Sequence, residues 1–439
     1  MADTPSPLSP RADGTPEASP GGGFEGDPDE ACVAIYPGPA GSLAHFCELV
    51  DGKPELIPVS EFVRWSSTAA FPLVPSRPAF RVWRKIKQNP RFDGADLPSE
   101  RAEDLSLSLS LESSGGGDFD RSRETSTQPS TGTGSAETME NPSGRRVSCH
   151  PRPGSIRERR WGFRPVREFD ATRDRGWFVN DDGGKAQAEA DCLTLVTVWP
   201  VYKGESFDLW QPDTSKFYDS ADVESVVAHL QTKRLAQSKT RRSAFAQQDE
   251  ATINDSTTLP CLHPRIAFRD VTNPTNTRTI VVALVPGNRV IVHSAPYLLL
   301  VEGTVVDEAY VLGVLCSMIC DWQARRTVEL HITFEQLNAL SIPDPGAGHP
   351  VRDRVANIAG RLAATDERFD QWAAQVGVPV GSVTDEATKQ DLLAELDACV
   401  AHLYGLDEAD LGVIYDTFSR TVDYSDRHAA VIDHFRRIL

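Results

Sequence analysis

The sequence predicts an α+β protein: a mixed α/β domain followed by a helical C-terminal region, with a disordered N-terminal tail and an internal low-complexity linker. Three observations support this prediction. Short apolar runs separated by Asn, Pro and Gly over 192–303 are typical of strands. An apolar segment at 308–326 is typical of a buried helix. Beyond position 347, apolar residues recur with the 3.6-residue period of amphipathic helices.

Residues 1–30 and 98–145 are the two segments that we expect to remain unfolded. The first is rich in Pro, Gly, Ser and Asp, and the second contains LSLSLSLESSGGG and STQPSTGTGSAETMENPSG. Such segments bury too little apolar surface to offset the entropy lost on ordering. The first also lacks the apolar stretch of a secretory signal, and the chain has no run of about eighteen apolar residues. We therefore expect a cytoplasmic protein without a membrane partner.

Residues 31–97 predict a small α/β module. ACVAIY and HFCELV are typical of strands, and Asp51-Gly52 before KPELIPV is a hairpin signal. SRPAFRVWRKIKQ predicts a helix, with Ser76 as its N-cap and Pro78 in its first turn.

Residues 146–345 form the main predicted domain. CLTLVTVWPVY (192–202) predicts a strand, and 220–237 predicts a helix with Ser220 or Asp222 near its start. Four further strand-like runs follow: PRIAFRDV, RTIVVALV, RVIVHSA and YLLLVEG.

The helical C-terminal region covers residues 346–439. Asp385 and Glu386 suit the N-terminus of one of its helices, and Gly405 suits that helix's end.

Charge is unevenly distributed along the chain. The net charge of −18 argues against nucleic acid as a partner of the whole surface. Residues 346–439 hold nine Lys and Arg against sixteen Asp and Glu, whereas Lys233 to Arg289 holds nine basic residues against four acidic ones. An acidic protein can still present one basic face, and that face would set its affinity for phosphate.

Catalytic motifs are missing. A DNA amino-methyltransferase needs an Asn/Asp/Ser-Pro-Pro-aromatic loop to hold the flipped base. The Asn-Pro pairs that begin at Asn89, Asn141 and Asn273 lack both the second proline and the aromatic residue, and the glycine-rich turn of a methyl-donor site is also missing. We therefore predict neither a catalytic residue nor a cofactor in this chain.

A metal-dependent nuclease is a weaker interpretation. Asp29, Asp51 and Lys53 have an acceptable spacing for holding Mg²⁺ against a phosphate. A disordered tail and a hairpin turn explain the same residues better. The eight cysteines form no C-x-x-C pair and the histidines form no zinc motif, so we expect buried free thiols and no metal site.

A polar, basic surface is the remaining candidate for function. Arg can read guanine bidentately and Asn can read adenine, and PRIAFRDVTNPTNTRT places both types in one strand–loop–strand unit. In the alternative interpretation, the arginines make structural hydrogen bonds and Asn-Pro-Thr-Asn is a tight turn. LQTKRLAQSKTRR offers phosphate contacts or merely a solvated face. The candidate DNA-binding residues are Arg265, Arg269, Asn273, Asn276, Arg278, Lys233, Arg241 and Arg242.

The order of these segments resembles the region after the catalytic domain of type IIG restriction–modification enzymes and related phage-defence adenine methyltransferases. The matching blocks include WGFRPVREFDATRDRGWF, WPVYKGESFDLWQ, PRIAFRDVTNPTNTRTIVVALVP, the segment 312–345 and AHLYGLDEADLGVIYDTF. The resemblance covers 33–97 and 146–439, identifies 146–345 as a DNA target-recognition domain, and adds Arg164 and Arg167 to the candidates.

The resemblance implies recognition of double-stranded DNA, coupled to methyl transfer from S-adenosylmethionine. This sequence departs from the family in lacking the methyltransferase domain. We therefore expect a recognition subunit or fragment that works with a separate catalytic methyltransferase subunit, to which the S-adenosylmethionine belongs. The alternatives are a scaffold protein of a phage-defence complex and an unrecognised nuclease.

The strand–loop–strand unit at 264–279 gives a first prediction. If Arg269 and Arg278 reach base edges, replacing each with Ala weakens DNA binding by about 1–3 kcal/mol in a folded protein. Affinity measurements on the double variant check this, and unchanged affinity would remove both side chains from the interface.

Overall fold

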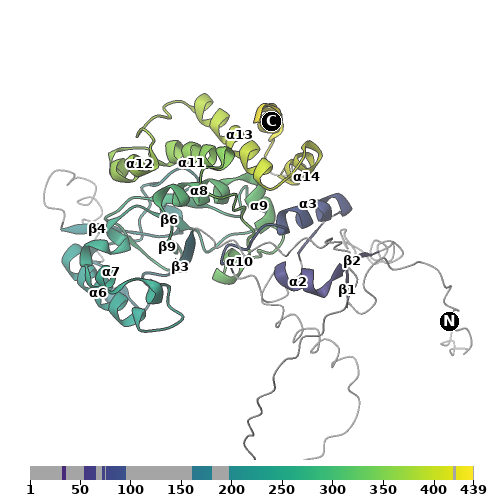
Figure 1. Cartoon of the computed structure of the whole chain (residues 1–439). Helices are drawn as coiled ribbons and strands as arrows, with labels where there is room; N and C mark the ends of the chain where they lie inside the picture. The colour runs from purple at the N-terminus through teal and green to yellow at the C-terminus, as the bar shows by residue number, and fades with distance from the viewer. Residues whose placement is uncertain are drawn as a thin grey trace, which may run out of the picture.

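The computed structural model describes the folded parts of the chain as a helical layer above a central sheet (Figure 1). The described residues are 32–35, 54–65, 72–74, 76–94, 161–179, 197–418 and 422–438. The predicted tail and linker, the Asp51-Gly52 turn and the nuclease candidates Asp29 and Lys53 lie outside them. In this described part, no helix has both the length and the apolar character needed to cross a bilayer.

The described residues of the N-terminal module form two strands and two helices. β1 (Cys32–Ile35) pairs antiparallel with β2 (Glu55–Pro58), and α2 (Val59–Trp65) and α3 (Arg77–Lys87) follow. The Ser76 hydroxyl accepts a hydrogen bond from the Ala79 N–H, which confirms the predicted cap. HFCELV lies outside the described residues.

The central sheet has four strands in the order β3 (Gly162–Val166), β9 (Tyr297–Glu302), β6 (Arg265–Phe268) and β7 (Val282–Val285). The last three confirm predicted strands. Both β3 and β6 pair antiparallel with β9. They are therefore parallel to each other, and their carboxyl ends meet at the same edge of the sheet.

Both faces of this sheet are buried. Ile266 and Phe268 of β6 point toward the core that includes the helical layer, whereas Ala267 between them belongs to a second core on the opposite face. This two-residue alternation is the geometry of a pleated strand. Because both faces carry apolar side chains, β6 and β7 appear in the sequence as continuous apolar runs.

A second sheet has the strand order β5 (Asp219–Asp222), β4 (Val198–Tyr202), β8 (Val290–Ile291), with β4 and β8 parallel. Helix α6 (Val223–Ser238) packs on it. The helix was predicted to begin at 220, but residues 220–222 belong to β5. Asp222 is its N-cap, because the Asp222 carboxylate accepts from the Ser225 N–H. The short helix α7 (Glu250–Asn254) packs against α6.

The predicted buried helix at 308–326 is two helices, α8 (Val305–Cys316) and α9 (Met318–Ala324). Ser317 between them has an extended backbone, and its hydroxyl accepts from the Cys320 N–H. A serine side chain that bonds to nearby backbone favours a helix end over continuation. Ser317 therefore interrupts the apolar segment by capping the N-terminus of α9.

The described residues beyond position 349 form five α-helices: α11 (Pro350–Ala363), α12 (Asp370–Val376), α13 (Glu386–Leu403), α14 (Glu408–Phe418) and α15 (Ser425–Ile438). They follow the short α10 (Phe334–Asn338). Asp385 lies at the N-terminus of α13, as predicted, and the structure shows that it is the N-cap, because its carboxylate accepts from the Thr388 N–H. Gly405 follows α13 at a φ of 67°, a left-handed conformation that suits glycine.

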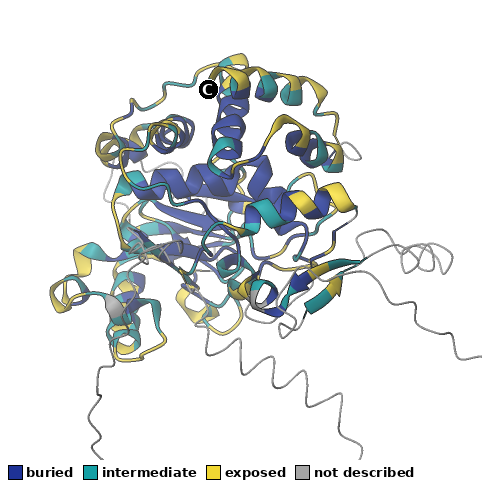
Figure 2. Ribbon diagram, turned by 45° about the vertical axis from the view of Figure 1, so that its right-hand side comes forward, coloured by how far each residue is buried: buried dark blue, intermediate teal, exposed yellow. Residues whose placement is uncertain are grey.

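One continuous core joins the N-terminal module, one face of the central sheet and the C-terminal helices. Helix α8 lies at its centre and is buried along most of its length, as Figure 2 shows. It packs against α11 and β7, while α14 packs against α3. The core is therefore continuous across position 345/346, where the sequence predicted the start of the helical C-terminal region. Cys261, Cys316, Cys320 and Cys399 are buried free thiols, as predicted.

Glu308 of α8 gives a test of this packing. Its buried carboxyl group accepts a hydrogen bond from Trp372 Nε1 at 2.8 Å, and burial raises its pKa from 4.5 to about 7. Between these values the folded state binds more protons than the unfolded state, so the free energy of unfolding falls as pH rises.

We predict that Glu308→Gln removes this dependence, because the amide stays neutral and can still accept from Trp372. Relative to wild type, the variant gains on the order of 3 kcal/mol between pH 4.5 and pH 7. Urea unfolding of both proteins at pH 5 and pH 8 measures the difference. An identical pH dependence in the two proteins would contradict the burial of this carboxyl group.

Candidate nucleic-acid interface

The carboxyl ends of β3 and β6 bring Arg167 and Arg269 to the same edge of the central sheet. Arg167 is half exposed, donates to Asp270 Oδ2 at 3.1 Å and lies 4.9 Å from the centre of the Phe334 ring. Arg269 donates to the Phe207 carbonyl at 2.5 Å and lies 3.4 Å from Asp208 Oδ2. Both guanidinium groups are therefore held by intramolecular partners, and only Arg167 keeps a largely open face.

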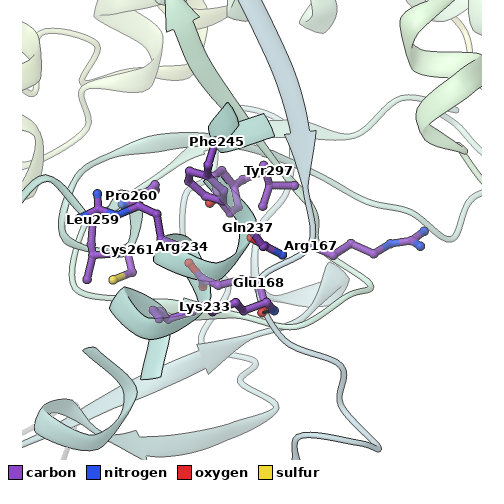
Figure 3. Close-up of a pocket in the computed structure, with 12 residues that line it drawn as sticks. Arg167, Glu168, Lys233, Arg234, Gln237, Phe245, Leu259, Pro260, Cys261 and Tyr297 are labelled. Atoms are coloured by element: carbon purple, nitrogen blue, oxygen red, sulfur yellow. Dashed lines mark hydrogen bonds between the residues drawn. The ribbon is translucent and has the colours of Figure 1, made fainter. Parts of the chain in front are cut away.

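Arg265 is directed into the protein, toward Glu168, which lines the pocket drawn in Figure 3. Its side chain is 4% exposed and lies 3.1 Å from Glu168 Oε2, while it also donates to the Pro260 carbonyl at 2.9 Å. The carboxylate of Glu168 accepts from the Ile291 N–H as well. Burial raises the pKa of Glu168, and the Arg265 guanidinium opposes that rise. The structure thus corrects the predicted base contact of Arg265: it is one half of a buried ion pair.

Lys233 of α6 lies beside this pair. Its ammonium donates to the Glu168 carbonyl and lies 5.7 Å from the centre of the Phe169 ring. The neighbouring Arg234 is buried and donates to Thr258 Oγ1 and to the Asp255 carbonyl. Lys233 and Arg234 therefore hold α6 to the segments around Glu168 and Asp255. Lys233 has a structural contact, and the phosphate contact predicted for it stays a prediction.

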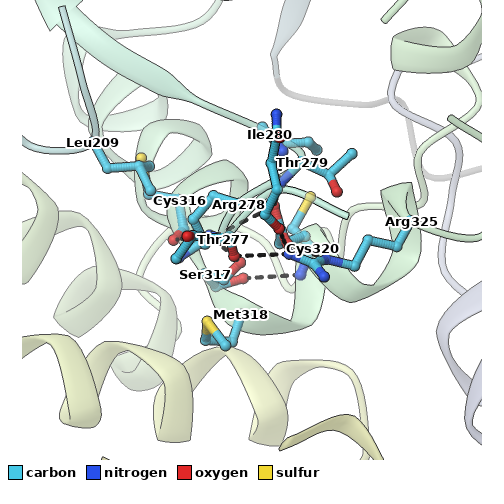
Figure 4. A network of polar contacts seen from close by, with 12 residues as sticks. Leu209, Thr277, Arg278, Thr279, Ile280, Cys316, Ser317, Met318, Cys320 and Arg325 are labelled. Carbon is cyan, nitrogen blue, oxygen red and sulfur yellow. Dashed lines mark hydrogen bonds and ion pairs between the residues drawn. The ribbon is translucent and has the colours of Figure 1, made fainter. Parts of the chain in front are cut away.

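The loop between β6 and β7 is fastened by Asp321 of α9. Figure 4 shows the loop residues Thr279 and Ile280 in this network, with Arg325 nearby. Asp321 Oδ1 accepts from the N–H groups of Thr279 and Ile280, both at 2.7 Å, and Oδ2 accepts from Arg325 Nε at 2.9 Å. Arg325 in turn donates to the carbonyls of Asn276 and Thr277. Sequence reasoning missed Asp321 and Arg325. The available signal was a charged pair inside an otherwise apolar helix.

Arg278 also points inward and donates to the carbonyls of Cys316 and Ser317 at 2.7 and 2.9 Å. Arg278 therefore makes structural hydrogen bonds, as in the alternative interpretation. Replacing it would disturb the fold, so a loss of DNA binding in such a variant would not show a contact with DNA. Asn273 forms the tight turn of the alternative interpretation, since its Oδ1 accepts from the N–H and hydroxyl of Thr275. Asn276 is exposed at the tip of the loop.

A group of outward-facing basic residues follows α6. Lys239, Arg241 and Arg242 are exposed, and they make no ion pair with any carboxylate in the described ranges. A 3-10 helix (Ala244–Gln247) follows them and contacts β3 and β9. Arg164 of β3 lies in register with Leu299, whose side chain faces this same side of the sheet. We call Lys239, Arg241, Arg242 and Arg164 the basic surface.

Ligand sites for a metal are not found in the described residues, where no three His, Cys, Asp or Glu side chains gather. The candidate nuclease residues fall outside these residues.

The comparisons with known proteins do not show a family for this chain. No family model matches the chain, and no curated protein matches it. Among solved structures, the chain is similar to the type IIL restriction–modification enzyme MmeI in complex with DNA, at 12% identity and a TM-score of 0.30. The match covers 59% of this chain and 35% of that chain, so this chain spans about a third of the enzyme's length. A TM-score of 0.30 is too low to establish a shared fold.

The inward orientation of Arg265 leads to a prediction. Arg265→Met leaves the Glu168 carboxylate buried without its cation, which costs about 3–5 kcal/mol of folding free energy. The double variant with Glu168→Gln, which removes the charge and keeps an acceptor for the Ile291 N–H, recovers part of this loss. Urea unfolding measures both. A single variant as stable as wild type would show that Arg265 is free for another role.

Proposed function

We propose that this chain binds double-stranded DNA as the recognition component of an adenine-specific restriction–modification methyltransferase. The observation that carries the proposal is the basic surface of this acidic protein, where Lys239, Arg241 and Arg242 are exposed and Arg164 is partly exposed. None of the four pairs with a carboxylate of the residues that the structure describes. Three of these four cations lie within four consecutive residues, and the next acidic residue along the chain is Asp249.

Local charge decides whether such a surface attracts DNA. At physiological ionic strength, charges more than about 8 Å apart are largely screened, so the distant acidic helices weaken the attraction only slightly. Each phosphate that a Lys or Arg neutralises releases condensed counterions, which makes the affinity depend on salt. The basic surface would therefore hold the DNA backbone, and other groups would have to read the sequence.

The link to methyl transfer rests on the ordered sequence blocks that resemble the recognition region of adenine methyltransferases. In this proposal, a separate polypeptide binds S-adenosylmethionine and flips the adenine, while this chain positions the duplex. The chain's own contribution is binding and orientation, supplied by the basic surface and by the loop that Asp321 fastens.

We predict that the triple variant Lys239→Ala, Arg241→Ala, Arg242→Ala binds duplex DNA more weakly and with a smaller salt dependence. If each side chain contacts one phosphate, the slope of log K against log salt falls in magnitude by about 2 to 3. Fluorescence anisotropy with the full-length chain and a labelled duplex, at several salt concentrations, measures the slope.

The matched control is the triple variant Arg81→Ala, Lys389→Ala, Arg437→Ala, which removes the same charge from α3, α13 and α15. It is expected to retain the wild-type slope. Equal losses in both variants would mean general charge attraction, and no binding by the wild-type chain would favour the scaffold alternative.

A further inference from the structure

The β6–β7 loop presents an unusual combination of side chains to solvent. Val271 is 60% exposed, and the neighbouring Leu330 is 62% exposed. The two segments are joined directly, because the Thr272 N–H donates to the Leu330 carbonyl at 3.0 Å and Val271 forms a β-bridge with His331. A few residues further on, the exposed carboxamide of Asn276 lies at the tip of the same loop. Adjacent aliphatic groups and a hydrogen-bonding amide are thus displayed to solvent by one loop and the segment bound to it.

The backbone that carries these groups is fixed. Arg325 donates to the carbonyls of Asn276 and Thr277, and the Asn276 N–H donates to the Asn273 carbonyl at 3.0 Å. At the base of the loop, the Thr272 hydroxyl donates to the Thr279 carbonyl at 2.6 Å. The Asn276 side chain therefore starts from a defined position, and binding would cost less ordering entropy than in a free loop.

The chemistry of the exposed groups selects one pair of bases. A carboxamide matches the N6 donor and N7 acceptor of adenine in the major groove, and an aliphatic side chain matches the C5 methyl group of thymine. Guanine is read by Arg or Lys. The two arginines between β6 and β7 are both engaged inside the protein: Arg269 donates to the Phe207 carbonyl, and Arg278 donates to the carbonyls of Cys316 and Ser317. The loop thus offers an amide and aliphatic groups for A·T base pairs, while its arginines are held by backbone carbonyls.

We infer that the loop 271–277 reads A·T base pairs in the major groove, with the Asn276 carboxamide on adenine and the Val271 methyl groups on thymine. This inference rests on the proposed function, since it requires that the chain binds duplex DNA. Asp321 and Arg325 act as positioning residues: they bond to the backbone between β6 and β7, and Asp321 also pairs with the Arg278 side chain.

The test begins with selection of binding sites from a random duplex library by the full-length chain. The expected consensus contains at least one A·T pair at which Asn276→Ala loses about tenfold in affinity and accepts other pairs, as for a lost bidentate contact. The matched control is Asn254→Ala, an exposed asparagine at the end of α7, which should leave the consensus unchanged.

Atomic substitutions in the DNA then identify the contacts. Replacing thymine by deoxyuridine at the identified pair removes one methyl group and should weaken wild-type binding about fourfold, with no further loss in Val271→Ala. Replacing adenine by 7-deazaadenine should weaken wild-type binding and leave Asn276→Ala unaffected. Val422→Ala, another exposed valine, serves as the control variant.

The outcomes separate the two proposals. A consensus that is insensitive to Asn276→Ala, Val271→Ala and both base analogues overturns the reading loop while leaving DNA binding intact. Binding without any consensus overturns it as well. Failure of the wild-type chain to bind duplex DNA overturns both the reading loop and the proposed function, and Val271 and Leu330 would then belong to a protein interface.

Discussion

The buried carboxylate of Asp321 is the constraint on which the proposed recognition face depends. This side chain is fully buried, and it is the acceptor for two consecutive backbone N–H groups of the β6–β7 loop and for Arg325. Without it, two N–H groups and a guanidinium would be left in the core with unmet hydrogen bonds, at a cost of a few kcal/mol. One residue of α9 therefore sets the start of β7, the course of the loop and the position of its tip.

The arginines of this protein divide into two roles that burial distinguishes. Arg265, Arg278 and Arg325 lie inside and hold carboxylates or backbone carbonyls, whereas Arg241 and Arg242 face water. A guanidinium offers five N–H donors, so an arginine near the core can fasten several loop carbonyls at once. Arg241 and Arg242 form the basic surface together with Lys239 and Arg164, and this group is local enough to attract phosphate in a protein whose net charge is −18.

Local signals in the sequence predicted much of the fold, but the direction of the charged side chains could not be predicted. The caps at Ser76 and Asp385 and the strands β6, β7 and β9 follow from neighbouring residues and from apolar patterns. The burial of Arg265 and Arg278 depends instead on Glu168 and on the end of α8, which are distant in sequence. A basic residue in a strand–loop–strand unit looks the same in the sequence whether it faces a phosphate or a buried carbonyl. Arg164, Arg241, Arg242 and Asn276 were among the predicted residues, and Lys239 lies in the predicted basic segment LQTKRLAQSKTRR. Asp321 and Arg325 were found only from the structure.

The central claim is that the basic surface and the β6–β7 loop, and no other part of the described chain, contact duplex DNA. Hydrogen–deuterium exchange of the full-length chain, with and without a saturating duplex, tests it most directly. The account predicts slower exchange in the segments 239–247 and 271–277, with the C-terminal helices unchanged. Protection confined to α11–α15, or no protection at all, would contradict it.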